Sequence, residues 1–455
     1  MISVALTIHV LLTKSDVRAA AGWIGLGCFS PFAGGLAYLL LGINRVQRRA
    51  LRMRGGALVA VRGSRAETVP PADRHHLDPL RRSIGFITGR PTVAGCLIDI
   101  LHDGDEAYPA MLAAIEHARS SVGLSSYILR DDEIGRRFVV ALHAAHQRGV
   151  QVRVIVDGVG GGWIISPAFR RLRRMGVPAQ RFMHSAVPWR MPFLNLRTHR
   201  KLLVVDGALA FTGGLNIASQ NVLATCPPNP VQDTHFQLRG PVVRQLVEAF
   251  AGDWSFLTGE VLGGSAWCPS LDPVGQATAR VVTAGPDQDL EKVEFSIMQA
   301  IACAQRSIHV MTPYFLADQA MMTALSLAAM RGVAVDVIVP EHSDNRAVEW
   351  AMRENVKALL HDGGRIWRST PPFRHSKLMV VDHEWSLIGS SNWDTRSLRL
   401  NFELCVEVYD GALAGELEAL MARCRGRALV AQELADRDLL GHLRDSAVRL
   451  LLPYL

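Results

Sequence analysis

Two short segments of the sequence place a histidine, a lysine and an aspartate at the same spacing. Each reads His-x-Lys, four apolar residues and then Asp: His199, Lys201 and Asp206 in the first copy, and His375, Lys377 and Asp382 in the second. In an extended strand, residues two apart point to the same side, so the histidine and lysine of each copy share a face. A lysine offers a point charge to a phosphate oxygen, and a histidine can serve as nucleophile or proton carrier. The two segments therefore predict chemistry at a phosphate group.

The aspartate of each copy completes the candidate catalytic set, but its position differs from that of the histidine and the lysine. It lies five residues after the lysine. Strand alternation therefore puts Asp206 and Asp382 on the opposite face from Lys201 and Lys377. For this reason we expect the two aspartates to have a structural role.

An asparagine follows each copy at a second fixed spacing. Asn216 and Asn392 come ten residues after the aspartates, and each is preceded by two small residues, Gly213–Gly214 or Gly389–Ser390. Small residues allow close backbone approach, and the amide offers hydrogen-bond donors to phosphate oxygens. Asn216, Asn392 and Ser390 are therefore the candidate phosphate-binding residues.

The motif segments belong to a longer internal repeat. Residues 114–129 and 148–157 resemble residues 300–316 and 331–340, and each copy predicts a helix, a strand, a helix and a strand. The strands are rich in valine and isoleucine, which is typical of strands buried on both faces. Alternating strands and helices favour an α/β fold made of two sandwich halves with mixed sheets.

The duplication also has a chemical rationale. A single histidine at the end of an apolar strand is more often a structural residue than a catalytic one. Phosphodiester exchange, however, needs one group to attack phosphorus and another, opposite, to protonate the leaving oxygen. Two halves related by a pseudo-twofold axis supply both groups across one interface.

The composition excludes several classes of protein. The 455 residues suggest two or three domains, and an apolar content of 49% excludes intrinsic disorder. The seven cysteines show no C-x-x-C spacing, which predicts reduced thiols rather than disulfides or a zinc site. We therefore expect no metal and no cofactor. The mean hydropathy of +0.15 is high for a soluble enzyme, which indicates a concentrated apolar segment.

That apolar segment is near the N-terminus. Residues 19–43 contain no charged residue, and about 20 apolar residues suffice to cross a bilayer, so we predict a transmembrane helix over 19–43, kinked at Pro31. A buried core helix or a signal peptide is the alternative. Residues 1–12 would span only about 18 Å, so they form an interfacial segment or part of a first helix. Five arginines within residues 45–54 predict that the chain beyond the helix stays in the cytoplasm.

These patterns divide the chain into three parts. Residues 1–60 are the predicted membrane anchor, residues 61–265 the first half and residues 266–455 the second half. The last segment, residues 439–455, combines leucines with arginines. It fits either a helix packed on the catalytic domain or an amphipathic helix lying at a lipid surface.

The paired motifs resemble the HxKxxxxD…G(G/S)xN signature of the phospholipase D superfamily, over roughly residues 90–430. Within it, the chain is similar to the bacterial cardiolipin synthases, because of the membrane segment and the stretches DTHFQLRGP and NWDTRSLRLNFEL after the two motifs. The resemblance implies a duplicated phospholipase D-like fold in a bacterial cell-membrane enzyme. It implies that one histidine attacks a phospholipid phosphorus to give a phosphatidyl-histidine, while the other protonates the leaving alcohol. In the family the histidine of the N-terminal copy is usually the nucleophile, which favours His199.

The resemblance also implies roles for neighbouring residues. The non-bridging phosphate oxygens would be held by Lys201, Lys377, Asn216 and Asn392. Asp233 and Glu403 stand at matching positions in DTHFQL and NFELCV and are the carboxylates best placed to orient the histidines. The match is looser in the first copy, where residues 226–232 insert a turn-rich loop.

The implied reaction converts two phosphatidylglycerols to cardiolipin and glycerol, with phosphatidylethanolamine open as another donor or acceptor. A phospholipase D-type hydrolase shares the covalent intermediate, and a nuclease is a further alternative. Residues 45–54 contribute five of the seven net positive charges, which suits an anionic membrane better than DNA. We therefore expect phosphatidylglycerol, other anionic phospholipids and the membrane as partners, and no nucleic acid.

Overall fold

The computed structural model describes residues 2–14, 17–39, 75–162, 165–184, 197–286 and 289–450. The chain forms two compact units, Met1–Gly56 and Ala57–Leu455. Residues 40–43 of the predicted membrane segment and the arginine-rich run 45–54 lie outside the described residues.

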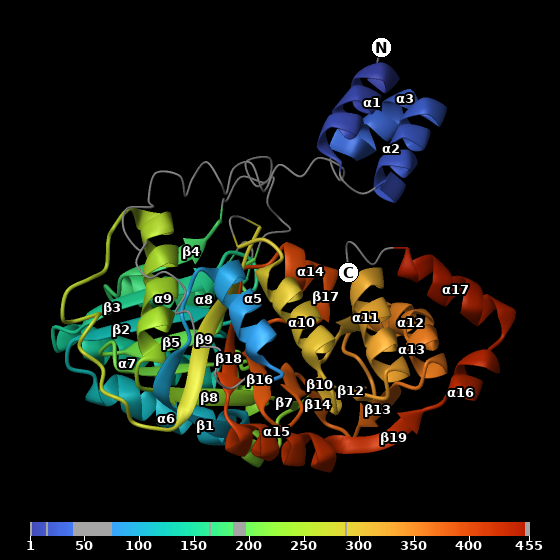
Figure 1. Cartoon of the computed structure of the whole chain (residues 1–455). Coiled ribbons are helices and arrows are strands. Elements are labelled where there is room, and N and C mark those ends of the chain that lie inside the picture. The colour runs from blue at the N-terminus through green and yellow to red at the C-terminus, as the bar shows by residue number, and fades with distance from the viewer. Residues whose placement is uncertain are drawn as a thin grey trace. The chain divides into compact units, whose positions relative to one another are not determined.

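The N-terminal unit contains three helices, α1 (Ile2–Thr13), α2 (Val17–Phe29) and α3 (Pro31–Ala37) (Figure 1). Its core is small and comprises the buried side chains of Leu6, Val10 and Tyr38. Many other apolar side chains of this unit are exposed: Ile2, Val4, Ile8, Leu11, Leu12, Val17, Leu26, Phe29, Phe32, Leu36 and Leu39. The predicted short apolar segment 1–12 is therefore helical, in α1.

The described part of the predicted transmembrane helix 19–43 is divided at the expected kink: α2 ends at Phe29 and α3 begins at Pro31. A new helix begins at Pro31, because proline has no N–H to donate to the preceding turn and is favoured at the first position of a helix. Gly34 then lies against the end of α2, where a Cβ atom would be 2.5 Å from the carbonyl oxygen of Leu26. Within the described ranges, no helix combines the length and apolar character needed to cross a bilayer.

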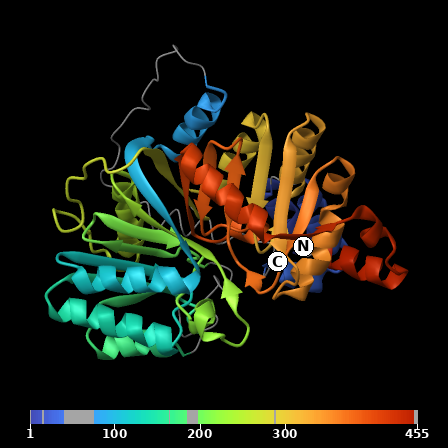
Figure 2. The ribbon, with the colours of Figure 1, turned by 90° about the horizontal axis from the view of Figure 1, so that it is seen from below.

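A 15-stranded sheet runs through the described part of the second unit (Figures 1 and 2). The strands before residue 265 are β1 (Val93–His102), β2 (Ser121–Ser126), β3 (Gln151–Asp157), β4 (Ala179–Phe182), β5 (Leu202–Val205), β6 (Leu209–Gly213) and β8 (Thr234–Arg239). The later strands are β9 (Ala277–Ala284), β10 (Ser307–Met311), β12 (Ala334–Pro340), β13 (Arg365–Ser369), β15 (Leu378–Val381), β16 (Trp385–Gly389), β18 (Glu403–Tyr409) and β19 (Arg425–Leu429).

The strand order repeats outward from the centre of this sheet. On one side of the central β1–β9 pair the order is β1-β8-β6-β5-β2-β3-β4, and on the other it is β9-β18-β16-β15-β10-β12-β13-β19. In both halves the outer strands β2–β3–β4 and β10–β12–β13 pair in parallel, while the inner strands pair antiparallel. The predicted α/β fold with duplicated halves and mixed sheets is confirmed.

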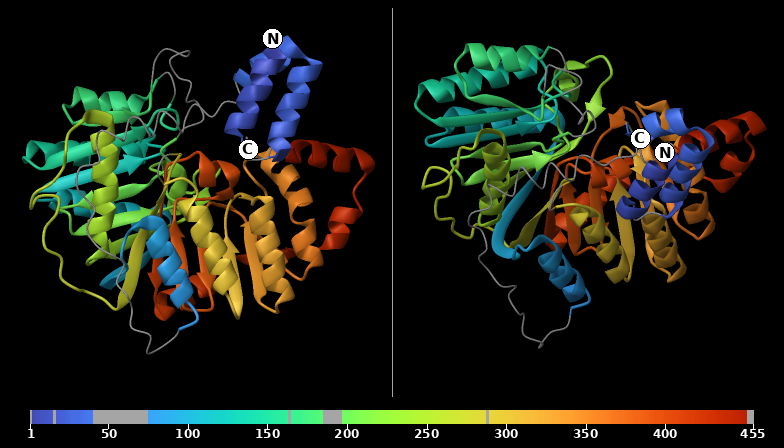
Figure 3. Two further views of the ribbon diagram at one scale, coloured as in Figure 1. Left: turned by 45° about the horizontal axis from the view of Figure 1, so that its top comes forward. Right: turned by 90° about the horizontal axis from the view of Figure 1, so that it is seen from above.

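Helices cover both faces of this sheet (Figure 3). Those of the first half are α5 (Asp78–Thr88), α6 (Asp103–His117), α7 (Glu133–Gln147), α8 (Pro167–Arg174) and α9 (Val242–Thr258), with 3-10 turns at Ser219–Asn221 and Leu223–Thr225. Those of the second half are α10 (Lys292–Cys303), α11 (Gln319–Met330), α12 (Arg346–Asn355), α13 (Lys357–His361), α14 (Thr395–Arg399), α15 (Gly411–Cys424), α16 (Ala431–Ala435) and α17 (Leu439–Arg449).

The described residues of this unit have three apolar cores, one of which joins the halves. The first half packs α6, α7 and α8 into one core, and the second half packs α10, α11 and α12 into another. The third core contains Phe250 of α9 together with Leu417 of α15, so it is shared. Helix α5 precedes β1 in sequence, yet its residues Leu80 and Ile84 belong to the core of the second half. The halves are therefore interlocked by packing as well as by the sheet.

Two short strand pairs complete the architecture near the motifs. Strand β7 (Val231–Gln232) of the first half pairs in parallel with β14 (Phe373–Arg374) of the second. Within the second half, β11 (Phe315–Leu316) pairs with β17 (Trp393–Asp394). A single parallel bridge joins Thr198 to Phe402. The segments that carry the two histidines are thus each tied to the opposite half.

Candidate active site

The two histidines precede equivalent strands of the sheet. His199 lies just before β5 and His375 just before β15, and every residue of both strands is buried. Each strand is flanked by neighbours on both sides, β2 and β6 or β10 and β16, so its position is fixed. The sequence predicts this arrangement, because the apolar run after each lysine can only be accommodated in the centre of a sheet.

Each histidine is hydrogen bonded to a carboxylate of the opposite half. Nδ1 of His199 is 2.9 Å from Oε1 of Glu403, and Nδ1 of His375 is 2.8 Å from Oδ2 of Asp233. A carboxylate at Nδ1 favours the tautomer with its proton on that nitrogen, which leaves Nε2 with a free lone pair. The matching positions of Asp233 and Glu403 in the repeat identify these carboxylates, but they do not reveal that the pairs cross between the halves.

Main-chain hydrogen bonds hold each histidine next to its carboxylate. The N–H of His199 donates to the carbonyl of Phe402 over 2.9 Å, and the N–H of His375 donates to the carbonyl of Gln232 over 2.7 Å. Phe402 and Gln232 are the residues immediately before Glu403 and Asp233. The same backbone contact is therefore made twice, once in each direction across the interface.

The two lysines are buried beneath the histidines. Nζ of Lys201 donates to the carbonyl oxygen of His199 over 2.8 Å and lies 5.3 Å from the ring centre of Tyr127. Nζ of Lys377 lies 2.7 Å from Nδ1 of His375. Burial, together with the charge of Lys377, lowers the pKa of Lys201 to about 7, and burial lowers the pKa of Lys377 to about 8. Both ammonium groups would be stabilised by an anion between them.

The histidines themselves are neutral in the resting site. Burial and then the two lysine charges hold the pKa of His199 well below its ordinary value, and burial and Lys377 lower the pKa of His375 to about 4. A neutral imidazole with a free Nε2 is the form that can attack phosphorus.

The two carboxylates differ in charge state. Burial raises the pKa of Glu403 to about 7. Burial also acts to raise the pKa of Asp233, but the charges of Lys377 and the hydrogen bond from His375 outweigh it, so the net shift is downward. At neutral pH Asp233 is therefore ionised, while Glu403 is close to its titration point.

Asp206 and Asp382 lie at the far ends of β5 and β15, outside the set of residues that line the cavity. Asp206 accepts hydrogen bonds from the backbone N–H groups of residues 119–121. Asp382 accepts equivalent bonds from residues 305–307, and a further one from Nε2 of His76. The two aspartates fasten the same loop in each half, the connection that leads into β2 or β10.

Asn216 and Asn392 line the cavity, whereas Ser390 does not. The Oδ1 atoms of both asparagines are buried and have no hydrogen-bond partner within the described residues. The hydroxyl of Ser390 donates to Oε2 of Glu403 over 2.5 Å and accepts from the N–H of Leu404. The structure thus places Ser390 behind Glu403 rather than at a phosphate. Its spacing from Asn392 identified the residue but not the direction of its side chain.

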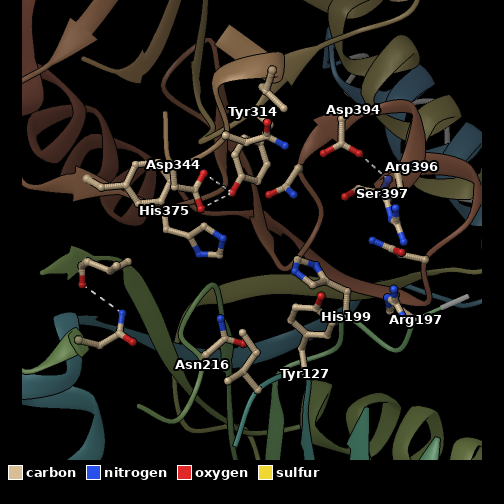
Figure 4. A pocket seen from close by; sticks show the side chains of 18 of the residues that line it. Tyr127, Arg197, His199, Asn216, Tyr314, Asp344, His375, Asp394, Arg396 and Ser397 are labelled. Carbon is tan, nitrogen blue, oxygen red and sulfur yellow. Dashed lines mark hydrogen bonds between the residues drawn. The ribbon is translucent and has the colours of Figure 1, made fainter. Parts of the chain in front are cut away.

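The cavity between the two histidines has a volume of about 380 Å³ (Figure 4). Apart from the histidines and asparagines, the polar side chains that line it are Tyr127, Arg130, Arg197, Gln220, Asn221, Tyr314, Asp344, Asn345, Asp394, Arg396, Ser397 and Asn401. Tyr127 meets the ring of His199 edge-on, with 4.9 Å between the ring centres, and Tyr314 lies 6.4 Å from His375. These tyrosines stand at matching positions of the repeat, in SSYIL and TPYFL, a signal from which both were predictable.

A separate cluster of histidines lies outside this cavity. His75, His76 and Glu384 bring three potential metal-ligating atoms within 4.8 Å of one another. His75 is 2.7 Å from Glu384, and His76 is 2.9 Å from Asp382. These two pairings account for the cluster by hydrogen bonding within the protein.

Comparison with known proteins agrees with the geometry of the site. Residues 111–254 and 297–425 match the family model described as "Cardiolipin synthase, PLD-like domain". The chain is 35% identical to the cardiolipin synthase of Geobacillus kaustophilus, over 90% of this chain and 82% of that protein. It is 32% identical to cardiolipin synthase A of Pseudomonas aeruginosa, over 91% of this chain and 86% of that protein.

A solved structure shares the fold. Phosphatidylserine synthase of Haemophilus influenzae superposes with a TM-score of 0.64 at 15% sequence identity, covering 83% of this chain and all of that one. At this identity the likeness concerns the fold alone. Two matches to the family model, one in each half, and relatives above 30% identity over most of the chain identify the family. The chain therefore belongs to the cardiolipin synthase family of phospholipase D-like proteins.

Proposed function

We propose that this protein is a phosphatidyltransferase that converts two molecules of phosphatidylglycerol to cardiolipin and glycerol. The observation that carries the proposal is the reciprocal pairing of His199 with Glu403 and of His375 with Asp233 around one cavity. Two oriented imidazoles that share one cavity fit a double displacement at phosphorus, in which one attacks as the neutral base and the other acts as the acid. The names of the similar proteins, cardiolipin synthases, agree with this chemistry.

In the first step Nε2 of one histidine forms a bond to the phosphorus of the donor, and the bond from phosphorus to the head-group glycerol oxygen breaks. The other histidine, which takes up a proton from solvent at Nε2 when the anionic donor binds, gives that proton to the glycerol oxygen, and glycerol leaves. In the second step the same histidine removes the proton from the hydroxyl of the acceptor, whose oxygen bonds to phosphorus as the phosphorus–nitrogen bond breaks. At the end of the second step both histidines have the same bonds and protons as before the first step.

Lys201, Lys377, Asn216 and Asn392 surround the space in which negative charge develops. Each lysine has a lowered pKa in the absence of an anion. A phosphodiester carries one negative charge, so its binding offsets the repulsion between the lysines and favours their protonated form. The same charge raises the pKa of a neighbouring histidine toward the range in which it can donate a proton.

The proposal includes attachment to a bacterial membrane, with the catalytic unit in the cytoplasm. The N-terminal unit presents many exposed apolar side chains around a core of three residues. Helix α17 is also unusual, because Asp445 is buried while Leu439, Leu440 and Leu443 are 73%, 74% and 58% exposed. Apolar side chains arranged in this way gain free energy on entering lipid. Residues 1–60 would act as the anchor, and the halves 61–265 and 266–455 would each supply one histidine.

A lipid assay with the full-length protein tests the function. Purified protein mixed with phosphatidylglycerol vesicles should release one glycerol for each cardiolipin formed, as measured by mass spectrometry and an enzymatic glycerol assay. His199→Ala and His375→Ala should each reduce the rate by several orders of magnitude while leaving the circular dichroism spectrum unchanged. Formation of phosphatidic acid without cardiolipin would instead identify a hydrolase.

The membrane proposal has its own test. Replacing Leu439, Leu440 and Leu443 together with serine should weaken flotation with phosphatidylglycerol vesicles without lowering the melting temperature, because these side chains are exposed in the folded protein. Unchanged flotation would exclude α17 as a contact with lipid.

A further inference from the structure

Two arginines, one from each half, line the end of the cavity beside His199. Arg197 is two residues before that histidine, and Arg396 lies in α14, four residues after Asn392. Figure 4 shows both guanidinium groups next to His199, whereas Asp344 and Tyr314 lie next to His375. The two arginines, with Asp394 close to Arg396, therefore lie at the end of the cavity beside His199, and Asp344 lies at the end beside His375.

Arg197 and Arg396 are partly buried, and within the described residues they lack the ion pairs that the fully buried arginines have. Arg200 is bonded to Asp253 over 2.5 Å, and Arg280 is bonded to Glu407. In the part of the chain that the structure describes, neither Arg197 nor Arg396 forms an ion pair, and Nη1 of Arg197 is buried without a hydrogen-bond partner. A guanidinium whose Nη1 atom is buried without a partner loses hydration that nothing replaces, which indicates that an anion completes this end of the cavity.

The nearby carboxylates are already engaged. Asp157 accepts hydrogen bonds from the backbone N–H groups of Val159, Gly160 and Thr198. Asp394 caps α14 by accepting from the N–H of Ser397 over 2.6 Å, and burial raises the pKa of Asp394 to about 6. Burial, and then the charge of Arg197, lowers the pKa of Arg396. The two guanidinium groups therefore repel each other in the empty site.

The backbone holds both arginines in place. The carbonyl of Arg197 accepts the N–H of Phe402 over 2.8 Å, and the carbonyl of Arg396 accepts the N–H groups of Leu400 and Asn401. Main-chain positions fixed in this way lower the entropy lost when an anion is bound. A guanidinium also matches the planar, bidentate geometry of a phosphate.

We propose that Arg197 and Arg396 bind the phosphodiester of the acceptor phospholipid, the second phosphate in the reaction, and that the acceptor enters on the side of His199. This inference rests on the proposed function. The acceptor's attacking hydroxyl and its own phosphate are separated by one glycerol unit, so a phosphate held beside His199 presents the hydroxyl to that histidine.

The side from which the acceptor enters determines which histidine is the nucleophile and which transfers the proton. Incoming and leaving groups lie opposite each other in an in-line displacement. The acceptor oxygen therefore bonds to phosphorus as the bond from phosphorus to Nε2 of His375 breaks, and the acceptor's proton passes to Nε2 of His199. His375 is then the nucleophile, in contrast to the expectation from family habit. Glu403, the partner of His199, titrates near pH 7, which suits the histidine that exchanges protons.

Comparing two acceptors tests the arginine subsite. Cardiolipin formation uses an acceptor that carries a phosphate, whereas exchange of labelled glycerol into phosphatidylglycerol uses an acceptor without one. Arg197→Gln and Arg396→Gln should slow cardiolipin formation roughly ten- to hundredfold, as loss of charge-assisted hydrogen bonds does, and slow glycerol exchange much less. Arg197→Lys should recover part of the loss. Arg427→Gln, which removes the same charge at an exposed position of β19, is the matched control.

Three results would overturn the subsite or its basis. A parallel loss of both reactions would mean that the arginines bind the donor, and no loss in either would mean that they bind no substrate. A wild-type protein without either reaction would overturn the proposed function itself.

A trapping experiment tests the assignment of the histidines separately. A phosphatidyl ester of p-nitrophenol needs no general acid, because p-nitrophenolate leaves without a proton. With this substrate, His199→Ala should accumulate a lipid adduct on His375, detectable by mass spectrometry after acid-free quenching, and His375→Ala should form none. An adduct on His199 in the His375→Ala protein would overturn the side of entry.

Discussion

Nδ1 of His199, in the first half of the chain, donates a hydrogen bond across the interface to Oε1 of Glu403, in the second half, over 2.9 Å. The bond from His375 back to Asp233 is its counterpart. Either half alone would contain a histidine without its carboxylate and a buried carboxylate without its partner. Because an unpaired buried carboxylate is costly, each half stabilises the other at the site of reaction.

Glu403→Gln should therefore impair catalysis without removing the fold. The amide keeps the size of the side chain but cannot stabilise a positively charged imidazole. We expect kcat to fall by about three to four orders of magnitude, as it does when the orienting aspartate of a Ser-His-Asp triad is replaced. Initial rates of cardiolipin formation measure the effect. Asp233→Asn should cause a similar loss, and a variant at either position with near-normal kcat would contradict the role of the pair.

Gly214→Ala should disturb the first carboxylate by steric contact alone. A Cβ atom at Gly214 would lie 2.1 Å from Oδ1 of Asp233, a distance that requires Asp233 to move. We expect a loss of stability of about 1–3 kcal/mol, typical of overpacking, together with reduced activity. Gly252→Ala is the matched control, because nothing lies within 4 Å of a Cβ there and alanine favours the surrounding helix α9. Urea denaturation of the two variants distinguishes the steric clash with Asp233 from the effect of replacing a glycine with alanine in general.

The repeat is the reason that much of the site could be predicted from the sequence. His199 and His375 were identified because a second copy confirmed the spacing of the first, and Asp233 and Glu403 because they match in the two copies. The crossing of the pairs could not be predicted in this way. Alignment gives the position of a residue within its half, whereas the contact depends on how β7 and β14 bring the halves together.

Residues without a counterpart were missed. Arg197 aligns with Phe373 and Arg396 with Gln220, so the repeat gave no reason to single out either arginine. The sequence pattern also did not predict how the helices pack, since α5 lies before β1 but packs in the core of the second half. At the N-terminus, hydropathy averaged over residues 19–43 did not reveal that Pro31 starts a separate helix.

Asp206→Asn and Asp382→Asn should reduce stability more than catalysis. Each carboxylate accepts several backbone N–H bonds from the loop before β2 or β10, and its charge strengthens them. Asparagine keeps one uncharged acceptor oxygen and replaces the other with an NH2 group that cannot accept a hydrogen bond, so we expect a loss of about 1.5–3 kcal/mol in the free energy of unfolding. The kcat of the folded protein, measured well below the transition temperature, should stay near the wild-type value. A kcat reduced as strongly as in His199→Ala would instead place these aspartates in the chemistry.

The raised pKa of Glu403 makes a prediction for stability against pH. In the unfolded chain a glutamate titrates near pH 4.3, whereas burial raises the pKa of Glu403 to about 7 in the folded protein. Between these values the folded state keeps a proton that the unfolded state has lost. The contribution of Glu403 to stability is therefore fully present below about pH 4.3 and is lost as the pH rises to about 7.

Glu403→Gln removes this titration and isolates its effect. The free energy of unfolding of the wild type minus that of Glu403→Gln, from urea denaturation at a series of pH values, should fall between about pH 4.3 and pH 7 and level off above. Asp233→Asn should give the opposite sign, because the pKa of Asp233 is lowered and its contribution is lost only as the pH falls. A difference for Glu403→Gln that stays flat over this interval would show that Glu403 is fully ionised beside His199, and the asymmetry between the two carboxylates would then be absent.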